Sequence, residues 1–178
     1  MVNFPTGNHV FLRALELADI DLIYKWENDV NTWKVSCSLT PLSKFILQKY
    51  LENAHLDIYE VKQLRLMIVK VDHEKPIGTI ELFDFDPFHL RAGIGLMIHE
   101  LNEQKKGFGS EALSLIINYA FSYLGLHQLY CNIAEDNTDS LKLFQKSGFE
   151  IIGKKKEWIK NLQLGWIDEY ILQLINKK

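Results

Sequence analysis

The sequence IGLMIHELNEQKKGFGSEA at residues 94–112 predicts a strand, a polar loop and the start of a helix. Apolar residues over 92–98 favour the strand, and an apolar run over 110–124 favours the helix. The loop between them contains Gln104, Lys105, Lys106, Gly107, Phe108, Gly109 and Ser110. In this arrangement backbone N–H groups and the positive end of the helix dipole point towards a bound phosphate, and glycine lets the backbone approach closely.

The loop differs from two common phosphate-binding motifs. No Gly-Lys-Ser/Thr follows it, as a Walker P-loop requires, and only Gly107 and Gly109 are present where a dinucleotide fold has G-x-G-x-x-G. The residues of the loop alone leave two interpretations open: a phosphate-binding loop, or a glycine-rich helix entry without a ligand.

Hydrophobic periodicity predicts the remaining elements. We expect strands over residues 10–15, 64–71, 77–85, 92–98, 128–134, 149–155 and 166–175. We expect helices over residues 19–27, 40–54, 110–124 and 137–146, with irregular chain over 28–39. Asp19 and Thr40 suit helix N-caps, and a slip in alternation between Leu82 and Phe83 indicates a bulge. Helices separated by hairpin-like strands predict a mixed α/β (α+β) fold.

The composition is typical of a globular domain. The 178 residues suit a single domain over 1–178, and the formal net charge of −3 argues against a general nucleic-acid binder. Cys37 and Cys131 lie far apart, as expected for reduced thiols in the cytoplasm. Residues 1–5 lack the features of a signal peptide, and no apolar run is long enough for a membrane span.

A second motif, NTDSLKLFQKSGF, stands at residues 137–149. It resembles the N-x-x-A/S-x-x-L-Y-x-x-x-G-F signature of the GNAT superfamily of acetyl-CoA-dependent N-acetyltransferases. The loop at 104–110 is similar to that family's Q/R-x-x-G-x-G/A pyrophosphate loop, and one predicted strand separates the two motifs, as in the family. The resemblance covers nearly the whole chain. Residues 13–26 and 91–98 look like the branch of ribosomal-protein and spermidine N-acetyltransferases, and residues 126–130 and 165–168 look closer to the spermidine enzymes.

The resemblance implies a seven-stranded, mixed and mostly antiparallel sheet that splays in the middle, with helices on both faces. Acetyl-CoA would be the cosubstrate, and no metal is implied. Its pantetheine would pair with the backbone of Met97, Ile98 and His99, and an N–H within residues 96–98 would polarise the thioester oxygen. Residues 104–110 would hold the pyrophosphate. Further contacts with the pantetheine arm and thiol would come from Asn137, Lys142 and Phe144.

Acetylation of an amine requires a group that accepts the amine proton, because an amine with a pKa near 10 is mostly protonated at neutral pH. Glu81 and Asp84, on the predicted strand before residues 92–98, are the first choices. His99, Glu27 and Glu169 are further alternatives. Gly93 and Gly95 share one face of the strand over 92–98 and leave it without side chains, which favours close approach by a ligand or a helix.

Phe144 departs from the family pattern. The position usually carries tyrosine, which protonates the leaving thiolate, and phenylalanine cannot donate a proton. Because thiolate is a tolerable leaving group near neutral pH, we expect slower turnover rather than none. Tyr130 or a water molecule is an alternative donor.

Three functions fit the sequence. The first is acetylation of a small polyamine such as spermidine, and the second is acetylation of a ribosomal-protein N-terminus at alanine. The third is a CoA-binding regulatory module without catalysis. Residues 1–60 carry eight acidic and five basic residues, which slightly favours a cationic small substrate. The partner would then be an amine, small or peptidic, rather than nucleic acid or membrane, and the sequence leaves a homo-oligomer open.

Overall fold

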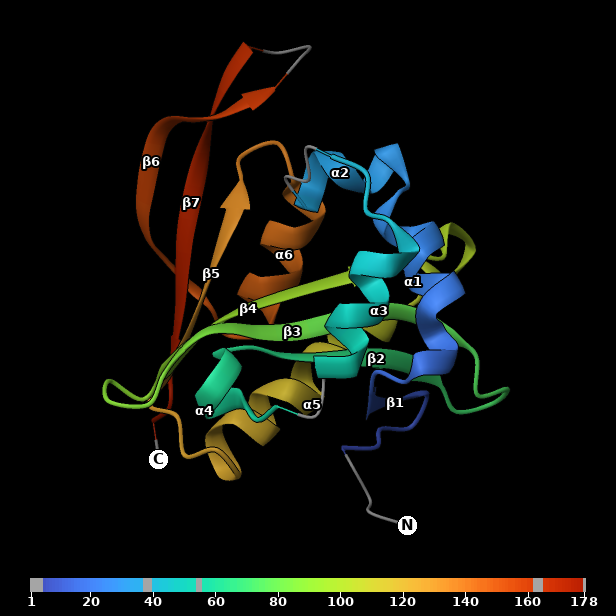
Figure 1. Cartoon of the computed structure of the whole chain (residues 1–178). Coiled ribbons are helices and arrows are strands. Elements are labelled where there is room, and N and C mark those ends of the chain that lie inside the picture. Colours follow the sequence, from blue (N-terminus) through green and yellow to red (C-terminus); the bar gives the residue numbers. More distant parts are fainter. Residues whose placement is uncertain (1–4, 37–39, 54–55, 162–164, 178) are drawn as a thin grey trace.

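The computed structural model describes residues 5–36, 40–53, 56–161 and 165–177. Its strands form one seven-stranded sheet in the order β1-β2-β3-β4-β5-β7-β6 (Figure 1). Their bounds are β1 Val10–Ala14, β2 Leu64–Lys70, β3 Pro76–Asp86, β4 Arg91–Ile98, β5 Gln128–Ala134, β6 Glu150–Asn161 and β7 Gly165–Ile175. All neighbouring strands are antiparallel except β4 and β5, which are parallel. The predicted mixed, mostly antiparallel sheet is therefore confirmed.

Strands β4 and β5 separate after a short paired segment. Residues 91–93 of β4 pair with residues 128–130 of β5, and no later pair joins these strands in the described chain. β4 nevertheless continues to Ile98 and β5 to Ala134. The predicted splay in the middle of the sheet is confirmed, and one edge of each strand lacks a strand partner there.

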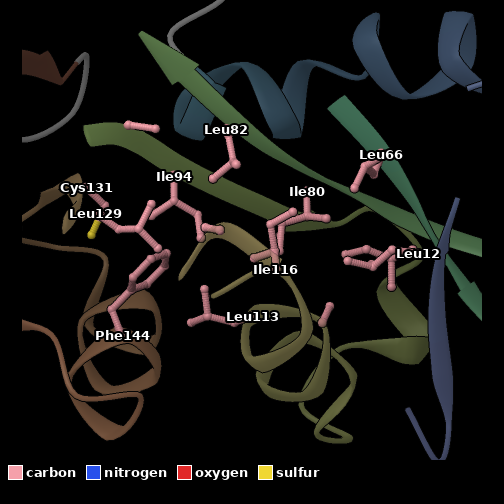
Figure 2. Packing of buried hydrophobic residues seen from close by; sticks show 14 of the residues in the cluster. Leu12, Leu66, Ile80, Leu82, Ile94, Leu113, Ile116, Leu129, Cys131 and Phe144 are labelled. Atoms are coloured by element: carbon pink, nitrogen blue, oxygen red, sulfur yellow. The ribbon is translucent and has the colours of Figure 1, made fainter. Parts of the chain in front are cut away.

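Two helices cover one face of the sheet. They are α5 (Phe108–Ser122) and α6 (Thr138–Lys146). Leu113 and Ile116 of α5 lie in one buried cluster with strand residues such as Ile80 and Ile94 (Figure 2). Burying such side chains stabilises the fold by about 1.5–3 kcal/mol each.

Helices also cover the opposite face, as predicted (Figure 1). α1 (Ile20–Glu27) and α3 (Lys44–Glu52) bury Trp26 and Leu47 against Met67 of β2 in a second cluster. Two shorter helices, α2 (Val30–Ser36) and α4 (Ile58–Val61), complete the described helices.

The segment between α1 and α3 differs from the prediction. Residues 28–39 are not all irregular, because α2 occupies Val30–Ser36, while residues 37–39, and with them Cys37, lie outside the described residues. The helix expected from Thr40 begins instead at Lys44, and the side chain of Ser43 accepts the cap bond from Ile46 N–H. The physical reason is Asn28, whose side chain bonds both the N–H and the carbonyl of Leu42 and keeps that residue out of the helix.

Asp19 occupies the N-cap position of α1, as predicted, but its side chain makes no cap bond to that helix. Its two carboxylate oxygens accept bonds of 2.7 Å from Arg13 on β1. Burial alone would raise the pKa of Asp19, but Arg13 and the N–H of Glu16 outweigh it and hold the pKa below its usual value. Asp19 thus ties the start of α1 to the edge strand.

Candidate active site

The open edge of β4 is the first part of the site. Hydrogen bonding alternates along an antiparallel pair, and the N–H of His99 bonds the carbonyl of Ile77 at 2.9 Å on the β3 side. The N–H groups of Leu96 and Ile98 therefore face the split. The carbonyl of Ile98 accepts a bond of 2.8 Å from Gln104 Nε2. Among the three residues predicted to pair with pantetheine, His99 already uses its N–H in the bond to Ile77. Met97 lies opposite Thr79, and its N–H points towards β3.

The predicted pyrophosphate loop has the backbone conformation that its glycine suggests. Lys105 has a φ of 61° and Gly107 a φ of 91°, both in the left-handed region. A Cβ at Gly107 would meet nothing within 4 Å, so the glycine serves the backbone angle rather than packing. α5 begins at the next residue, with its free N–H groups at this loop.

Side-chain contacts join this loop to β2 and α6. Glu103 is 8% exposed and lies 3.2 Å from Lys106 Nζ and 3.7 Å from Lys70 Nζ. Lys70 also lies over the ring of Phe108, and Lys105 forms an ion pair of 3.1 Å with Asp139 at the start of α6. These contacts fix the loop against β2 and α6.

The second motif forms the helix next to this loop. Asn137 is the N-cap of α6, and its Oδ1 accepts the N–H of Ser140 at 3.2 Å. A Cβ at Gly109 would lie 3.4 Å from Leu96 and 3.8 Å from Leu143, so the first turn of α5 packs closely against both β4 and α6. Of the other predicted residues, Lys142 is exposed on α6 and Ser110 is partly buried in the first turn of α5.

Phe144 points from α6 into the core beside the split. Phe144 is 4% exposed, and its ring packs edge-on against Phe149, with 5.1 Å between the ring centroids. Leu129 and Cys131 of β5 belong to the same buried cluster. Burial raises the pKa of the Cys131 thiol to about 12, which keeps it protonated. The environment at the usual tyrosine position is therefore apolar.

Glu81 lies beside β4 on the face of the sheet opposite α5 and α6. Its Oε2 accepts a bond of 2.8 Å from Gln63 Nε2. Its Oε1 lies 3.7 Å from the position that a Cβ on Gly95 would take, and Gly95 is opposite Glu81 in the register of β3 and β4. One carboxylate oxygen is thus anchored, and the other lies at the strand that borders the split.

Asp84 lies in the bulge of β3, beside Tyr130 of β5. The register shift in β3 falls between Phe83 and Asp86, rather than between Leu82 and Phe83, and Asp84 has a φ of 49° within it. Its carboxylate accepts the hydroxyl of Tyr130 at 3.1 Å. Burial first, and then Asp84, raise the pKa of Tyr130 to about 12.

The prediction that Gly93 leaves one face of β4 without side chains is wrong. A Cβ at Gly93 would lie 2.2 Å from the ring of Phe83, which occupies the space that the glycine leaves. Phe83 also meets Tyr130 edge-on at 5.9 Å. The glycine therefore accommodates a side chain from the neighbouring strand.

A buried polar network beneath α1 was not predicted as a unit. Arg65 of β2 pairs with Glu27 at the end of α1 and contacts Thr79, whose hydroxyl lies 3.2 Å from His99 Nε2. The His99 ring stacks on Trp26 at 4.5 Å. Burial, aided by Arg65, lowers the pKa of His99 to about 4. An arginine within the apolar run of β2 was the sequence signal for this network.

The remaining alternative carboxylate lies elsewhere. Glu169 of β7 pairs with Lys155 at 2.7 Å and sits opposite Ala134 at the far end of β5. In the described chain, no group of three or more His, Cys, Asp or Glu side chains is arranged to hold a metal ion. None of the described helices is long and apolar enough to cross a membrane.

Comparisons with known proteins agree with this geometry. The family model "Acetyltransferase (GNAT) domain" matches residues 9–150. Spermidine N(1)-acetyltransferase of Escherichia coli (strain K12) is 27% identical over 150 residues, which cover 84% of this chain and 77% of that protein.

Two solved structures share the fold. The crystal structure of spermidine N-acetyltransferase from Vibrio cholerae in complex with CoA and spermine has a TM-score of 0.85 at 23% identity, covering 97% of this chain and 98% of that one. A dodecameric structure of spermidine N-acetyltransferase from Vibrio cholerae has a TM-score of 0.77 at 23% identity, with 95% of each chain covered. The family match, the split strands and the glycine loop together show that the chain belongs to the GNAT acetyltransferases and is an acetyl-CoA-dependent N-acetyltransferase.

Proposed function

We propose that the protein transfers the acetyl group of acetyl-CoA to a primary amine of a polyamine such as spermidine. The observation that carries this proposal is the Glu81 carboxylate, which lies over Gly95 on the cofactor strand with one oxygen anchored by Gln63. A carboxylate in this position attracts an ammonium group and can accept its proton. The names of the similar proteins support a polyamine as the substrate, and the dodecameric relative supports a homo-oligomer.

In the proposed mechanism, Glu81 takes the amine proton directly or through one water molecule. The amine nitrogen then attacks the thioester carbonyl. The C–N bond forms, the C–S bond breaks, and CoA leaves as a thiolate that takes its proton from water or another donor. The N–H groups of Leu96 and Ile98 face the split and are placed to donate to the thioester oxygen. Asp84 is the weaker choice for the base because it bonds Tyr130 beside the paired segment of β4 and β5, whereas Glu81 lies at Gly95 on the open part of β4.

We also propose that the pyrophosphate binds residues 104–110 at the start of α5. The Gly107→Val variant is expected to weaken CoA binding about tenfold, because valine at a φ of 91° is strained and shifts the loop. Isothermal titration calorimetry with CoA measures this change.

Gly125→Val is the matched control, since Gly125 also has a positive φ of 65° and would meet nothing within 4 Å, but it follows the far end of α5. Its CoA affinity should equal that of the wild type. Unchanged affinity in the Gly107 variant would remove the loop from the binding site.

Restoring tyrosine at position 144 is expected to preserve or raise acetyl transfer. A phenol there can protonate the departing thiolate, and the benefit should be largest below the thiol pKa of roughly 8.5. The assay is steady-state release of CoA across neutral pH. Phe149→Tyr adds the same hydroxyl to the adjacent buried ring and is the control. A Phe144→Tyr variant that folds but loses activity at every pH would show that the apolar ring is itself needed.

A panel of acceptors tests the proposed function. Purified protein with acetyl-CoA is assayed against spermidine, spermine, aminoglycosides and basic peptides that begin with alanine. We expect the highest kcat/KM for a polyamine. A preference for alanine peptides would favour the ribosomal-protein alternative, and tight acetyl-CoA binding without transfer to any amine would favour a regulatory module.

A further inference from the structure

A concave site with no assigned role lies beside the closed end of the β4–β5 split. It is a cavity of about 480 Å³, within the size range of small-ligand pockets, and Arg91, Gln128 and Tyr130 of the paired segment line it. The aromatic neighbour of Tyr130 is Phe83, which stands two residues after Glu81 on the same face of β3. The cavity therefore lies on the same face of the sheet as Glu81, with Phe83 between them.

The cavity combines apolar and neutral polar surfaces. Ile152 of β6 and Ile171 of β7 contribute apolar side chains to its lining. Gln128 and Gln173 also line it, and the Gln173 side-chain amide donates to the Gln128 side-chain carbonyl. Methylene groups pack on the isoleucines, while the paired glutamines offer hydrogen bonds without adding charge.

The charges around the cavity leave one carboxylate available. Asp86 is held by Arg91 at 3.2 Å, by His89 at 2.8 Å and by the backbone N–H groups of residues 88 and 89. Asp84 accepts only the Tyr130 hydroxyl among its described contacts. Because Tyr130 keeps its proton, it orients the Asp84 carboxylate without neutralising it. The Asp84 carboxylate therefore offers a negative charge to a ligand in the cavity.

We propose that this cavity binds the methylene chain and distal ammonium of a diamine or polyamine whose reacting amine lies at Glu81, with Asp84 as the ammonium's partner. Three residues of β3 separate the two carboxylates, and the last of them lies in the bulge, so the distance along the strand is at most roughly 10 Å. A triamine or long diamine spans such a distance, whereas a short diamine does not. The ring of Phe83 lies between the two positions and can pack against the methylenes or an internal ammonium. This inference rests on the proposed function.

The first test compares acceptors of different length. Diaminopropane, diaminobutane, diaminohexane, diaminooctane and spermidine are assayed beside butylamine. We expect kcat/KM to rise with length, and Asp84→Asn to lower the ratio of kcat/KM for spermidine to that for butylamine at least about tenfold. Asp21→Asn, an equal charge change at an exposed position on α1, should leave the ratio unchanged. A ratio that Asp84→Asn does not alter would overturn the proposal.

A second measurement does not depend on turnover. Spermidine is titrated calorimetrically into the wild type, Asp84→Asn and Tyr130→Phe, each saturated with CoA. We expect the dissociation constant to rise at least about tenfold for Asp84→Asn and by a smaller factor for Tyr130→Phe, which keeps the ring but no longer orients the carboxylate. Binding that depends on Asp84 in a protein that acetylates no polyamine would contradict the proposed function and support the cavity. If the protein acetylates polyamines but neither Asp84→Asn nor Tyr130→Phe alters spermidine binding, the proposed function is supported and the cavity proposal is contradicted.

Discussion

The Glu81→Gln variant is expected to lower kcat for amine acetylation by roughly two to four orders of magnitude. The amide keeps the shape of the side chain and its neighbour Gln63, but it cannot accept the amine proton. Only amine that is already neutral can then react. The residual rate should therefore rise about tenfold per pH unit up to the amine pKa near 10, whereas the wild type should depend less steeply on pH. Steady-state CoA release from about pH 6 to 9 measures both effects.

Two controls separate catalysis from folding and cofactor binding. Glu60→Gln makes the same change on the exposed surface of α4 and should retain the wild-type kcat. Calorimetric titration should give the same CoA affinity for Glu81→Gln as for the wild type. The side chain lies on the face of the sheet opposite α5 and α6, where the amine is proposed to bind. Wild-type kcat in the Glu81 variant would transfer the role of base to another group, with Asp84 next in line.

The Arg65→Met variant is expected to lose about 3 kcal/mol of unfolding free energy, because it leaves the largely buried Glu27 without its cation. Burial alone would lower the pKa of Arg65, but the charges of Glu27 and Glu81 raise it, so the guanidinium stays charged. For a protein of this size the loss corresponds to a melting temperature lower by roughly 6–12 °C. Scanning calorimetry with chemical denaturation checks the value.

Replacing both partners should recover most of that loss. In the double variant Arg65→Met with Glu27→Leu, no charge remains buried alone, and apolar side chains of similar size fill the space. Lys44→Met removes an exposed ion pair with Asp21 and should scarcely change the melting temperature. A single Arg65 variant as stable as the wild type would show that the buried pair contributes nothing.

The sequence predicts those parts of the fold in which one short segment carries its own signal. The strand over 92–98, the loop with Gly107 and α5 follow one another directly, and their apolar periodicity and glycine are local. α2 was missed because tertiary contacts fix it. Trp33 Nε1 donates to the carbonyl of Glu27, and the hydroxyl of Thr32 donates to the carbonyl of Trp26. Such bonds leave no hydrophobic periodicity in the sequence.

The face of the sheet that carries Glu81 was predictable only in part, because its contacts join segments that are distant in the sequence. Glu81 could be chosen from its strand alone, but its anchor Gln63 stands before the preceding strand. The network of Arg65, Glu27 and His99 joins segments that are far apart in the chain. The direction of Asp84 depends on where the bulge in β3 falls, and alternation located that bulge only approximately.

The separation of β4 and β5 has a consequence for solubility. Among the described residues, three residue pairs join the strands β1–β4 to β5–β7, so the interior of this sheet contains two unpaired edges. Unpaired strand edges are templates on which other chains add and aggregate. The covering helices α5 and α6 shield one side. In the proposed binding mode, the pantetheine of acetyl-CoA would cover the open edges of residues 94–98 and 131–134. We therefore expect the protein to aggregate more readily without the cosubstrate than with it.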